Sequence, residues 1–234
     1  MRASRVLFSS LSGKTALFEE VARDVKSHNP DSVVIGADCN PDCPGATQVE
    51  HFITMPRLDK LLDKDLVQFC IENEITHVLP TRDGELNFWA TRRNLLTNIG
   101  VTPWVSGGSF IKSCEDKIDF FQKWKDSAIP TIPTFNKIKS SMATNWVVKE
   151  RKGSASQKIG LNLSSERAAK ISKDFTDPIF QPFISGKEFS AETWVSHANQ
   201  CHGVLLRWRD KVVDGESHHS TVFRNSAWEA KLRK

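Results

Sequence analysis

Short apolar runs alternate with helical periodicity through the first hundred residues, and this alternation limits the fold more than any other feature. Short apolar runs indicate buried strands, whereas apolar side chains spaced three and four apart indicate helices. Strands that alternate with helices predict a parallel sheet with right-handed crossovers. The strands are expected at residues 5–9, 32–37, 76–80 and 102–106, and the helices at 15–26, 58–74 and 86–96.

Polar residues follow three of these predicted strands, at residues 9–13, 38–40 and 81–85. Ligands of open parallel sheets bind beyond the carboxyl ends of the strands, so these stretches form one candidate binding edge. The charged stretch at 81–85 suits either the capped start of a helix or an edge that faces a substrate. The run Ser12-Gly13-Lys14-Thr15 lacks the glycine that a P-loop needs five residues before Gly13, because Phe8 stands there. A polar helix start is the better interpretation of that run.

An apolar run, Trp146-Val147-Val148, leads directly into a basic loop of small residues. Valine and tryptophan favour a half-buried strand. Small residues let another group approach the main chain, and a lysine at the strand end adds a point charge, so the loop suits a polyphosphate. An exposed hairpin tip with solvated charges fits this stretch equally well when it is taken alone. The candidate binding residues of this loop are Lys149, Arg151, Gly153, Ser154 and Ser156.

The rest of the second half mixes helices with strands that are not arranged as βα repeats. An extended connector is expected at 129–134, since a residue before proline is driven away from the helical conformation. Helices are expected at 113–128 and 164–174, strands at 179–184 and 188–196, a hairpin of 203–209 and 211–214 that turns near Asp210, and a polar segment at 215–225.

Residues 180–188 suit an adenine nucleotide. The carbonyl of Pro182 and the N–H of Ile184 offer an acceptor and a donor that can pair with the edge of an adenine ring. Glu188 could hold the ribose hydroxyls, while Lys117 and Lys149 could neutralise phosphates. Taken singly, each of these side chains also suits a solvated surface, so the interpretation rests on the joint pattern. The expected apolar walls are Val148, Phe180 and Phe183.

Composition limits the class of protein. The net charge of +4 is mild and spread along the 234 residues, which suits anionic small molecules and does not call for nucleic acid. No apolar run is long enough to span a bilayer, and no signal peptide begins the chain. Five cysteines with scattered spacing favour reduced thiols in the cytoplasm. Cys39 and Cys43 have no second pair to complete a zinc site.

Four blocks, in order, resemble the ATP-grasp superfamily, and more narrowly the carbamoyl-phosphate-synthase-like and PylC-like carboxylate–amine ligases. The blocks are VLPTRDGEL, SCEDKIDFFQKWKDSAIPTIPTF, WVVKERKGSAS and FQPFISGKEFSAETW. The resemblance implies an α/β fold, with an N-terminal pre-ATP-grasp parallel βα domain before an incomplete ATP-grasp α+β region. It implies domains at 1–106 and 107–234, with a lid subdomain at about 134–180 and the start of a C-terminal subdomain after it.

The resemblance also implies residue roles. Lys117 and Lys149 match the two ATP-binding lysines of the family, and Glu188 matches the residue that holds the ribose. Many relatives carry glutamate where Gln181 stands, although glutamine also occurs. The adenine hinge corresponds to Gln181, Pro182 and Ile184.

In the family, ATP converts a carboxylate to an acyl phosphate that an amine attacks, and Mg²⁺ bridges the phosphates. The sequence holds no E-x-N-P-R-like segment for the metal, so no residue is assigned as a metal ligand and no catalytic residue is named. The chain is expected to be either a fragment or a natural short form. Arg207 and Arg209 could face a phosphate or acyl phosphate, and a solvated strand face is the alternative.

Two functions follow from these patterns. The first is an ATP-binding ligase-type protein that acts on an unknown carboxylate and amine. The alternative is a non-catalytic scaffold or subunit derived from such a ligase, in which a partner or a second copy covers exposed apolar surface. Aromatic residues near the end of the chain favour this alternative: Trp208, Phe223 and Trp228.

Overall fold

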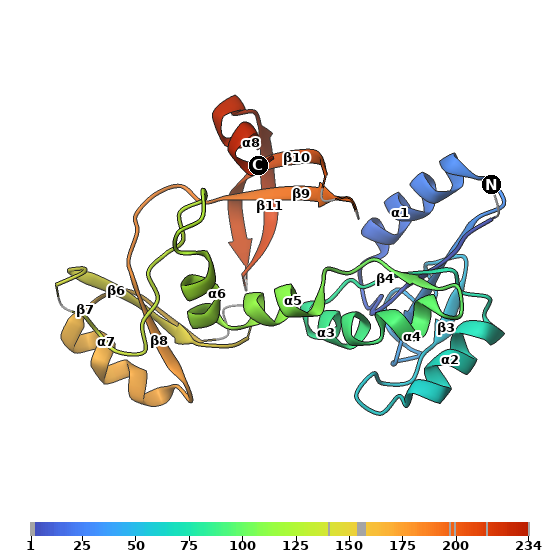
Figure 1. Cartoon of the computed structure of the whole chain (residues 1–234), viewed down its shortest axis with the longest axis horizontal. Helices are drawn as coiled ribbons and strands as arrows, with labels where there is room; N and C mark the ends of the chain where they lie inside the picture. Colours follow the sequence, from blue (N-terminus) through green and yellow to red (C-terminus); the bar gives the residue numbers. More distant parts are fainter. Residues whose placement is uncertain are drawn as a thin grey trace. The chain divides into compact units, whose positions relative to one another are not determined.

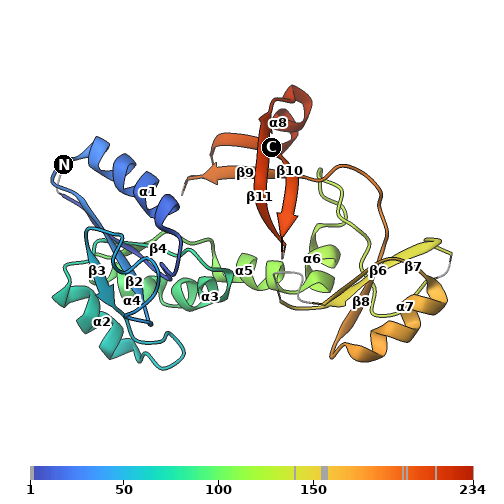
Figure 2. The ribbon, with the colours of Figure 1, turned by 180° about the vertical axis from the view of Figure 1, so that it is seen from behind.

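The computed structural model describes residues 3–139, 141–153, 158–196, 198, 200–213 and 215–233. These residues form two compact units, Met1–Lys112 (unit 1) and Ser113–Lys234 (unit 2). Figures 1 and 2 show the elements of both units from opposite sides. Within the described residues, no helix has the length and apolar character needed to cross a membrane.

Unit 1 contains a parallel sheet of five strands in the order β3-β2-β1-β4-β5, which confirms the predicted parallel βα fold (Figure 1). β1 lies at the centre, where Val6 is paired with Val34 on one side and with His77 on the other. The short edge strand β3 was not predicted. The strands are β1 (Arg5–Phe8), β2 (Val33–Asp38), β3 (Phe52–Thr54), β4 (His77–Leu79) and β5 (Thr102–Pro103).

Helices cover the sheet of unit 1 because its strands are apolar on both faces. Leu7 belongs to one buried cluster, whereas its neighbours Val6 and Phe8 belong to the other, as the period of two requires. The predicted helix at 86–96 is two helices, because Arg92 leaves the helical conformation between them. The helices are α1 (Thr15–His28), α2 (Asp63–Glu72), α3 (Asp83–Thr91) and α4 (Arg93–Thr97), and α5 (Gly108–Glu115) crosses the division between the units.

Unit 2 contains two antiparallel sheets of three strands each, which agrees with the expected α+β region. The first sheet has the order β7-β6-β8 and packs against α7, and the second has the order β11-β10-β9. Its elements are α6 (Lys117–Trp124), β6 (Asn145–Glu150), β7 (Ile159–Ser164), α7 (Ser165–Ile171), the 3₁₀ helix η1 (Ser172–Asp174), β8 (Pro178–Pro182), β9 (Phe189–Val195), β10 (Cys201–Val213), β11 (Glu216–Phe223) and α8 (Ser226–Leu232).

Two predicted elements of unit 2 are wrong. The helix expected at 113–128 is broken at Asp116, whose carboxylate accepts hydrogen bonds from the amides of Ile118 and Asp119 and so begins a new helix, α6. The hairpin expected near Asp210 does not form, because β10 continues through a bulge between Arg209 and Lys211. The polar segment expected at 215–225 supplies β11.

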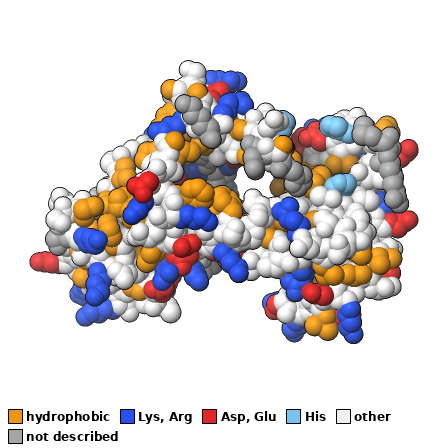
Figure 3. Space-filling model, viewed as in Figure 1, with side chains coloured by type: hydrophobic (Ala, Val, Ile, Leu, Met, Phe, Trp, Pro, Cys, Tyr) orange, Lys and Arg blue, Asp and Glu red, His pale blue; other side chains and the backbone are white. Residues whose placement is uncertain are grey.

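The charged side chains do not gather into one stripe on the visible face. Figure 3 shows Lys and Arg side chains spread among hydrophobic and uncharged ones. This distribution agrees with the mild net charge of +4.

Candidate functional site

The first sheet of unit 2 places Lys149 and Gln181 on one face. Lys149 of β6 lies opposite Ile179 of β8, and Val147 lies opposite Gln181. Directly opposed residues of an antiparallel pair project from the same side of a sheet. The four side chains therefore share a face, which is opposite to the face that packs against α7.

Two of the three apolar side chains expected to line the adenine pocket lie on the sheet face that packs against α7. Val148 is paired with Phe180, and both belong to the buried cluster that includes Trp146 and Ala168 of α7. The period of two along β6 separates Val148 from Lys149. Val147 and Ile179 are thus the apolar neighbours of Lys149 on the candidate site face, and the expectation for Val148 and Phe180 was wrong.

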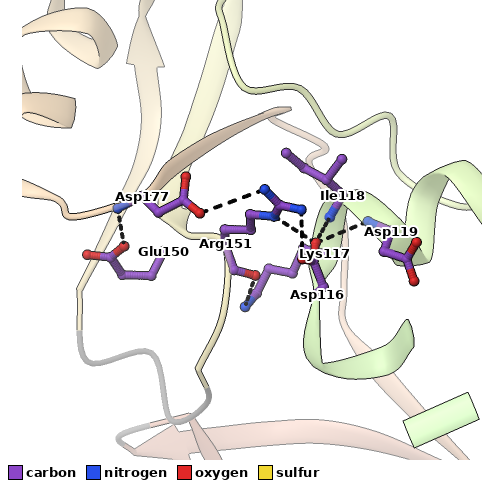
Figure 4. Close-up of polar contacts among 7 residues, drawn as sticks. All are labelled: Asp116, Lys117, Ile118, Asp119, Glu150, Arg151 and Asp177. Atoms are coloured by element: carbon purple, nitrogen blue, oxygen red, sulfur yellow. Dashed lines mark hydrogen bonds and ion pairs between the residues drawn. The ribbon is translucent and has the colours of Figure 1, made fainter. Parts of the chain in front are cut away.

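Lys117 begins α6 and contacts the start of the loop that follows β6 (Figure 4). Its Nζ donates to the carbonyl oxygens of Arg151, at 3.3 Å, and Gly153, at 3.0 Å. Its backbone N–H also donates to the Arg151 carbonyl, at 3.2 Å. These three bonds attach the first turn of α6 to the loop. Gly153 adopts φ +102°, a conformation that favours glycine over other residues.

Lys149 is a half-buried cation that has no anionic partner in the part of the chain that the structure describes. Burial is the main cause of the lowered pKa of Lys149, and the charge of Lys117 lowers it further. Burial also lowers the pKa of Lys117, although the carboxylates of Asp116 and Glu150 oppose that shift. Among the described residues, no carboxylate or other acceptor meets the Lys149 ammonium. Two neighbouring ammonium groups that lose hydration are stabilised when an anion binds between them.

An ion pair holds Arg151 against the N-terminus of α6 (Figure 4). The Arg151 guanidinium donates from Nε to Oδ1 of Asp116 at 2.9 Å, and its Nη2 lies 2.8 Å from Oδ2. Nη1 lies 3.9 Å from Asp177. The carboxylate of Glu150 accepts from the backbone amides of Thr176 and Asp177, at 2.9 Å and 3.0 Å. The guanidinium predicted for phosphate binding is therefore paired with Asp116 in this structure.

Replacing Arg151 with alanine is expected to lower the free energy of unfolding of unit 2 at pH 7 by a small amount, because the pair is partly exposed to solvent. Hydrogen bonds from Arg151 are the main cause of the lowered pKa of Asp116. The pair stabilises the fold fully at pH values above 3.8, the ordinary Asp pKa. This stabilisation is lost as the pH falls through the lowered pKa that Asp116 has in the folded chain. Hydrogen exchange of α6 amides at pH 7 and at a pH below the lowered pKa of Asp116 measures this loss.

The matched control for this prediction is Arg167→Ala, because Arg167 is an exposed arginine of α7 in the same unit. A difference between the Arg151→Ala variant and the native chain that persists unchanged at low pH would contradict the prediction.

Gln181 and Ile184 lie at the end of β8, but their environments differ. Gln181 is buried, and its Nε2 donates to Thr134 Oγ1 at 2.8 Å. β8 ends at Pro182, and Phe183 still donates its amide to the Asn145 carbonyl at 2.9 Å. Ile184 is 64 % exposed, and no acceptor in the described part of the chain meets its amide. A free amide beyond the strand end is available to a ligand.

Glu188 and the two predicted substrate arginines form ion pairs on the second sheet of unit 2. Glu188 accepts from Arg209, which also donates to the Gly215 carbonyl. Arg207 donates to Glu192 at 2.5 Å and to Ser220 Oγ at 2.8 Å. The structure thus separates these residues into two cross-strand pairs, each with a partner carboxylate.

Sequence reasoning missed three supporting residues of this site. Asp116 carried a visible capping signal, but its pairing with Arg151 spans the chain from residue 116 to residue 151. Thr134 and Glu150 had no local signal, because their partners are also distant in sequence. Ser154 and Ser156, which were predicted to bind the phosphates, lie outside the described residues.

The carboxylates of the described residues do not gather into a metal site. Within that part of the chain, no group of three or more His, Cys, Asp or Glu side chains is arranged to hold a metal ion. Glu188 and Glu192 are paired with arginines. Asp214 and the side chain of Glu216 lie outside the described part.

Family models cover most of the chain in two blocks. The model of the PylC-like N-terminal domain matches residues 6–104, and that of the ATP-grasp domain matches residues 114–217. No protein with a curated description matches the sequence.

Solved structures share the fold at low sequence identity. The biotin carboxylase domain of 2-oxoglutarate carboxylase from Hydrogenobacter thermophilus, in complex with MgADP, ADP and bicarbonate, has a TM-score of 0.71 at 12% identity, over 100% of this chain and 57% of that chain. Rhizobium etli pyruvate carboxylase has a TM-score of 0.69 at 8% identity, over 100% of this chain and 23% of that one. An L-amino acid ligase from Bacillus licheniformis has a TM-score of 0.63 at 18% identity, over 99% of this chain and 57% of that chain. The chain therefore spans less than two thirds of the length of each of these three proteins.

Proposed function

Since the chain belongs to the ATP-grasp superfamily, with a PylC-like N-terminal domain before its ATP-grasp domain, we propose that it binds ATP in unit 2. We propose further that it is related in activity to ligases that join a carboxylate to an amine through an acyl phosphate. The pre-ATP-grasp part corresponds to residues 1–106 and the ATP-grasp part to residues 107–234 in this proposal.

The uncompensated charge at Lys149 is the single observation that carries this proposal. Its ammonium is half-buried, its pKa is lowered by burial and by Lys117, and no described residue neutralises it. A folded chain tolerates such a cation when a ligand supplies the opposite charge. A triphosphate supplies several charged oxygens, whereas adenosine supplies none, so the site favours a nucleotide over a nucleoside.

The remaining predicted residues take the other parts of the nucleotide in this proposal. Gln181, Pro182 and the free amide of Ile184 accommodate the adenine edge, with Val147 and Ile179 as apolar neighbours. Glu188 holds the ribose through the carboxylate oxygen that its pair with Arg209 leaves free among the described residues. The phosphate loop comprises Lys149, Arg151, Gly153, Ser154 and Ser156.

Among the described residues, no group of three metal-ligating side chains is arranged to hold Mg²⁺, and Glu188 and Glu192 are paired with arginines. We therefore assign no residue to the metal and derive no step of the reaction through it. Arg207 and Arg209 remain proposed contacts for an acyl phosphate, which would compete with these glutamates for the guanidinium groups.

Isothermal titration calorimetry with ATP and ADP tests the proposal. We expect binding of both nucleotides to the folded protein at micromolar to millimolar concentration. The absence of heat at millimolar nucleotide, in a sample shown by circular dichroism to be folded, would refute it.

The scaffold alternative has support from a different surface. The three aromatics that suggested it are half-buried, because Trp208 stacks on Phe223 at 4.3 Å and Phe189 packs against Trp228 at 5.6 Å. Trp194 and Val222, on the second sheet of unit 2, are 60 % and 58 % exposed instead. A dimer that dissociates in a Trp194→Ser variant, without nucleotide binding in either protein, would favour a scaffold. A monomer that binds ATP would argue against it.

We also propose a cytoplasmic location. All five cysteines of the chain are free thiols in the structure, and Cys43 and Cys70 are buried among apolar residues. Reduced thiols of this kind persist in reducing compartments.

A further inference from the structure

Lys149 and Lys117 are close in space but differ in their hydrogen-bond partners. Lys117 donates from Nζ to the carbonyl oxygen of Arg151 at 3.3 Å (Figure 4), and to that of Gly153 at 3.0 Å. Carbonyl oxygens accept from an ammonium group, so they favour the charged form of Lys117. Lys149 has no such acceptor among the residues that the structure describes. Of the two side chains, Lys149 is therefore the one that loses its proton more readily.

The sheet keeps the Lys149 amine partly away from water. Lys149 of β6 is half-buried, and its face of the sheet also carries the apolar Val147 and Ile179. An ammonium group loses more hydration energy in such surroundings than a neutral amine does. Burial is accordingly the main cause of the lowered pKa of Lys149, and the charge of Lys117 is the second cause. A desolvated lysine beside another cation is an amine that acts as a nucleophile.

Carbon dioxide is an electrophile that suits this amine. It is small, uncharged and apolar, so it enters a half-buried site without a charged partner of its own. The lone pair of the neutral Lys149 Nζ forms a bond to the carbon, one C=O electron pair moves to oxygen, and one N–H proton leaves to solvent. The product is a carbamate with a single negative charge, and the step consumes no further reactant.

A carbamate supplies the negative charge that the surroundings of Lys149 lack. The carboxylates of Asp116 and Glu150, which act on the charge of Lys117, are bound by a guanidinium and by backbone amides. When both lysines are protonated, their like charges repel each other. The carbamate replaces one cation with an anion. Two of the three Lys117 ammonium hydrogens bond to backbone carbonyls, so one remains to donate to the carbamate.

We propose that Lys149 is a modification site at which carbon dioxide adds reversibly to the Nζ amine, and that Lys117 pairs with the resulting carbamate. A carbamate at this position repels the phosphates of a nucleotide, so carbon dioxide and ATP exclude each other there. The exclusion of ATP rests on the proposed function, whereas formation of the carbamate does not.

Chemical trapping tests the carbamate directly. The chain is equilibrated with isotopically labelled carbon dioxide and bicarbonate at neutral pH, without nucleotide. Triethyloxonium tetrafluoroborate then converts any carbamate to a stable ethyl ester, which peptide mass spectrometry locates. We expect the labelled adduct at Lys149 and none at Lys170, an exposed lysine of α7 in the same unit. No adduct at Lys149, or equal adducts at the two lysines, would overturn the proposal.

Two variants of Lys117 test its pairing with the carbamate. Lys117→Met removes the cation and is expected to abolish the adduct at Lys149. Lys117→Arg keeps a cation and is expected to retain the adduct, and circular dichroism verifies that both variants are folded. An undiminished adduct in Lys117→Met, or a lost adduct in folded Lys117→Arg, would contradict the assigned pairing.

Calorimetry with ATP separates this proposal from that of the nucleotide site. When trapping shows the carbamate on half of the chains, the apparent affinity for ATP is expected to be about twofold weaker than without carbon dioxide, because only unmodified chains bind. An unchanged affinity would overturn the exclusion of ATP. A chain that binds no ATP in either condition refutes the proposed function, and the trapping result still decides whether the carbamate forms.

Discussion

Replacing Lys149 with alanine is expected to weaken ATP binding about 30-fold and to leave adenosine binding unchanged. A hydrogen bond from a charged group is worth about 2 kcal/mol, and each 1.4 kcal/mol corresponds to a factor of ten in affinity. We expect the effect to come from the phosphates, because Lys149 is the proposed phosphate contact. It lies on the face of β6 and β8 that also carries Gln181, a proposed contact of the adenine. Calorimetric titration of the variant with ATP, ADP and adenosine measures this difference.

The matched control for this variant is Lys170→Ala. Lys170 lies on α7, which packs on the opposite face of the same sheet, so its removal changes the net charge equally without touching the proposed site. Equal losses of affinity for ATP in both variants would indicate a general charge effect. Equal losses for ATP and adenosine in the Lys149 variant would contradict its role with phosphate.

Replacing Glu85 with alanine is expected to lower the free energy of unfolding of unit 1 by about 3–5 kcal/mol. The side chain is fully buried and accepts from Ser9 Oγ, Trp89 Nε1 and the amides of Thr81 and Arg82. Alanine leaves the two fully buried donors, the Ser9 hydroxyl and the Trp89 N–H, without this acceptor, and each unsatisfied buried donor costs about 1–3 kcal/mol. The amides of Thr81 and Arg82 are only partly buried, so water can replace the carboxylate there. The loss combines with the cavity that the shorter side chain creates.

Native-state hydrogen exchange of the β1 amides measures this loss of stability. Glu85→Gln should lower the free energy of unfolding less than Glu85→Ala. The glutamine amide oxygen still accepts from the backbone amides, and the Ser9 hydroxyl can rotate to accept from the new NH₂ group, although the Trp89 N–H is left unsatisfied. Glu20→Ala is the control, because Glu20 is an exposed residue of α1. Exchange in Glu85→Ala that matches this control would show that the buried network does not stabilise unit 1.

Local sequence patterns predicted the architecture of unit 1 because its strands are buried on both faces. Continuous apolar runs such as Val33–Asp38 are distinctive, and helices between them require parallel pairing. The strand Phe52–Thr54 was not predicted, since three residues within a polar segment give no periodicity. Its pairing with β2 comes from tertiary contact, where Gly36 lies opposite Phe52.

The candidate site was predictable in part for a similar reason. Lys149 was found because the strand before it and the loop after it are local signals. Its face of the sheet depends on the register with β8, which no local pattern encodes. The ion pair of Asp116 with Arg151 likewise joins segments 35 residues apart. The sequence around Asp210 predicted a turn, but the pairing of β10 with β11 on one side and with β9 on the other maintained the strand.

Lysine labelling with and without ATP tests the central claim most directly. Lys149 has a lowered pKa, so a larger fraction of it is neutral and reactive toward an acylating reagent near pH 8 than of an ordinary lysine. The account predicts that millimolar ATP reduces acylation of Lys149 and Lys117, as measured by mass spectrometry, while acylation of Lys170 stays constant. Acylation of Lys149 that is the same with and without ATP would contradict the account.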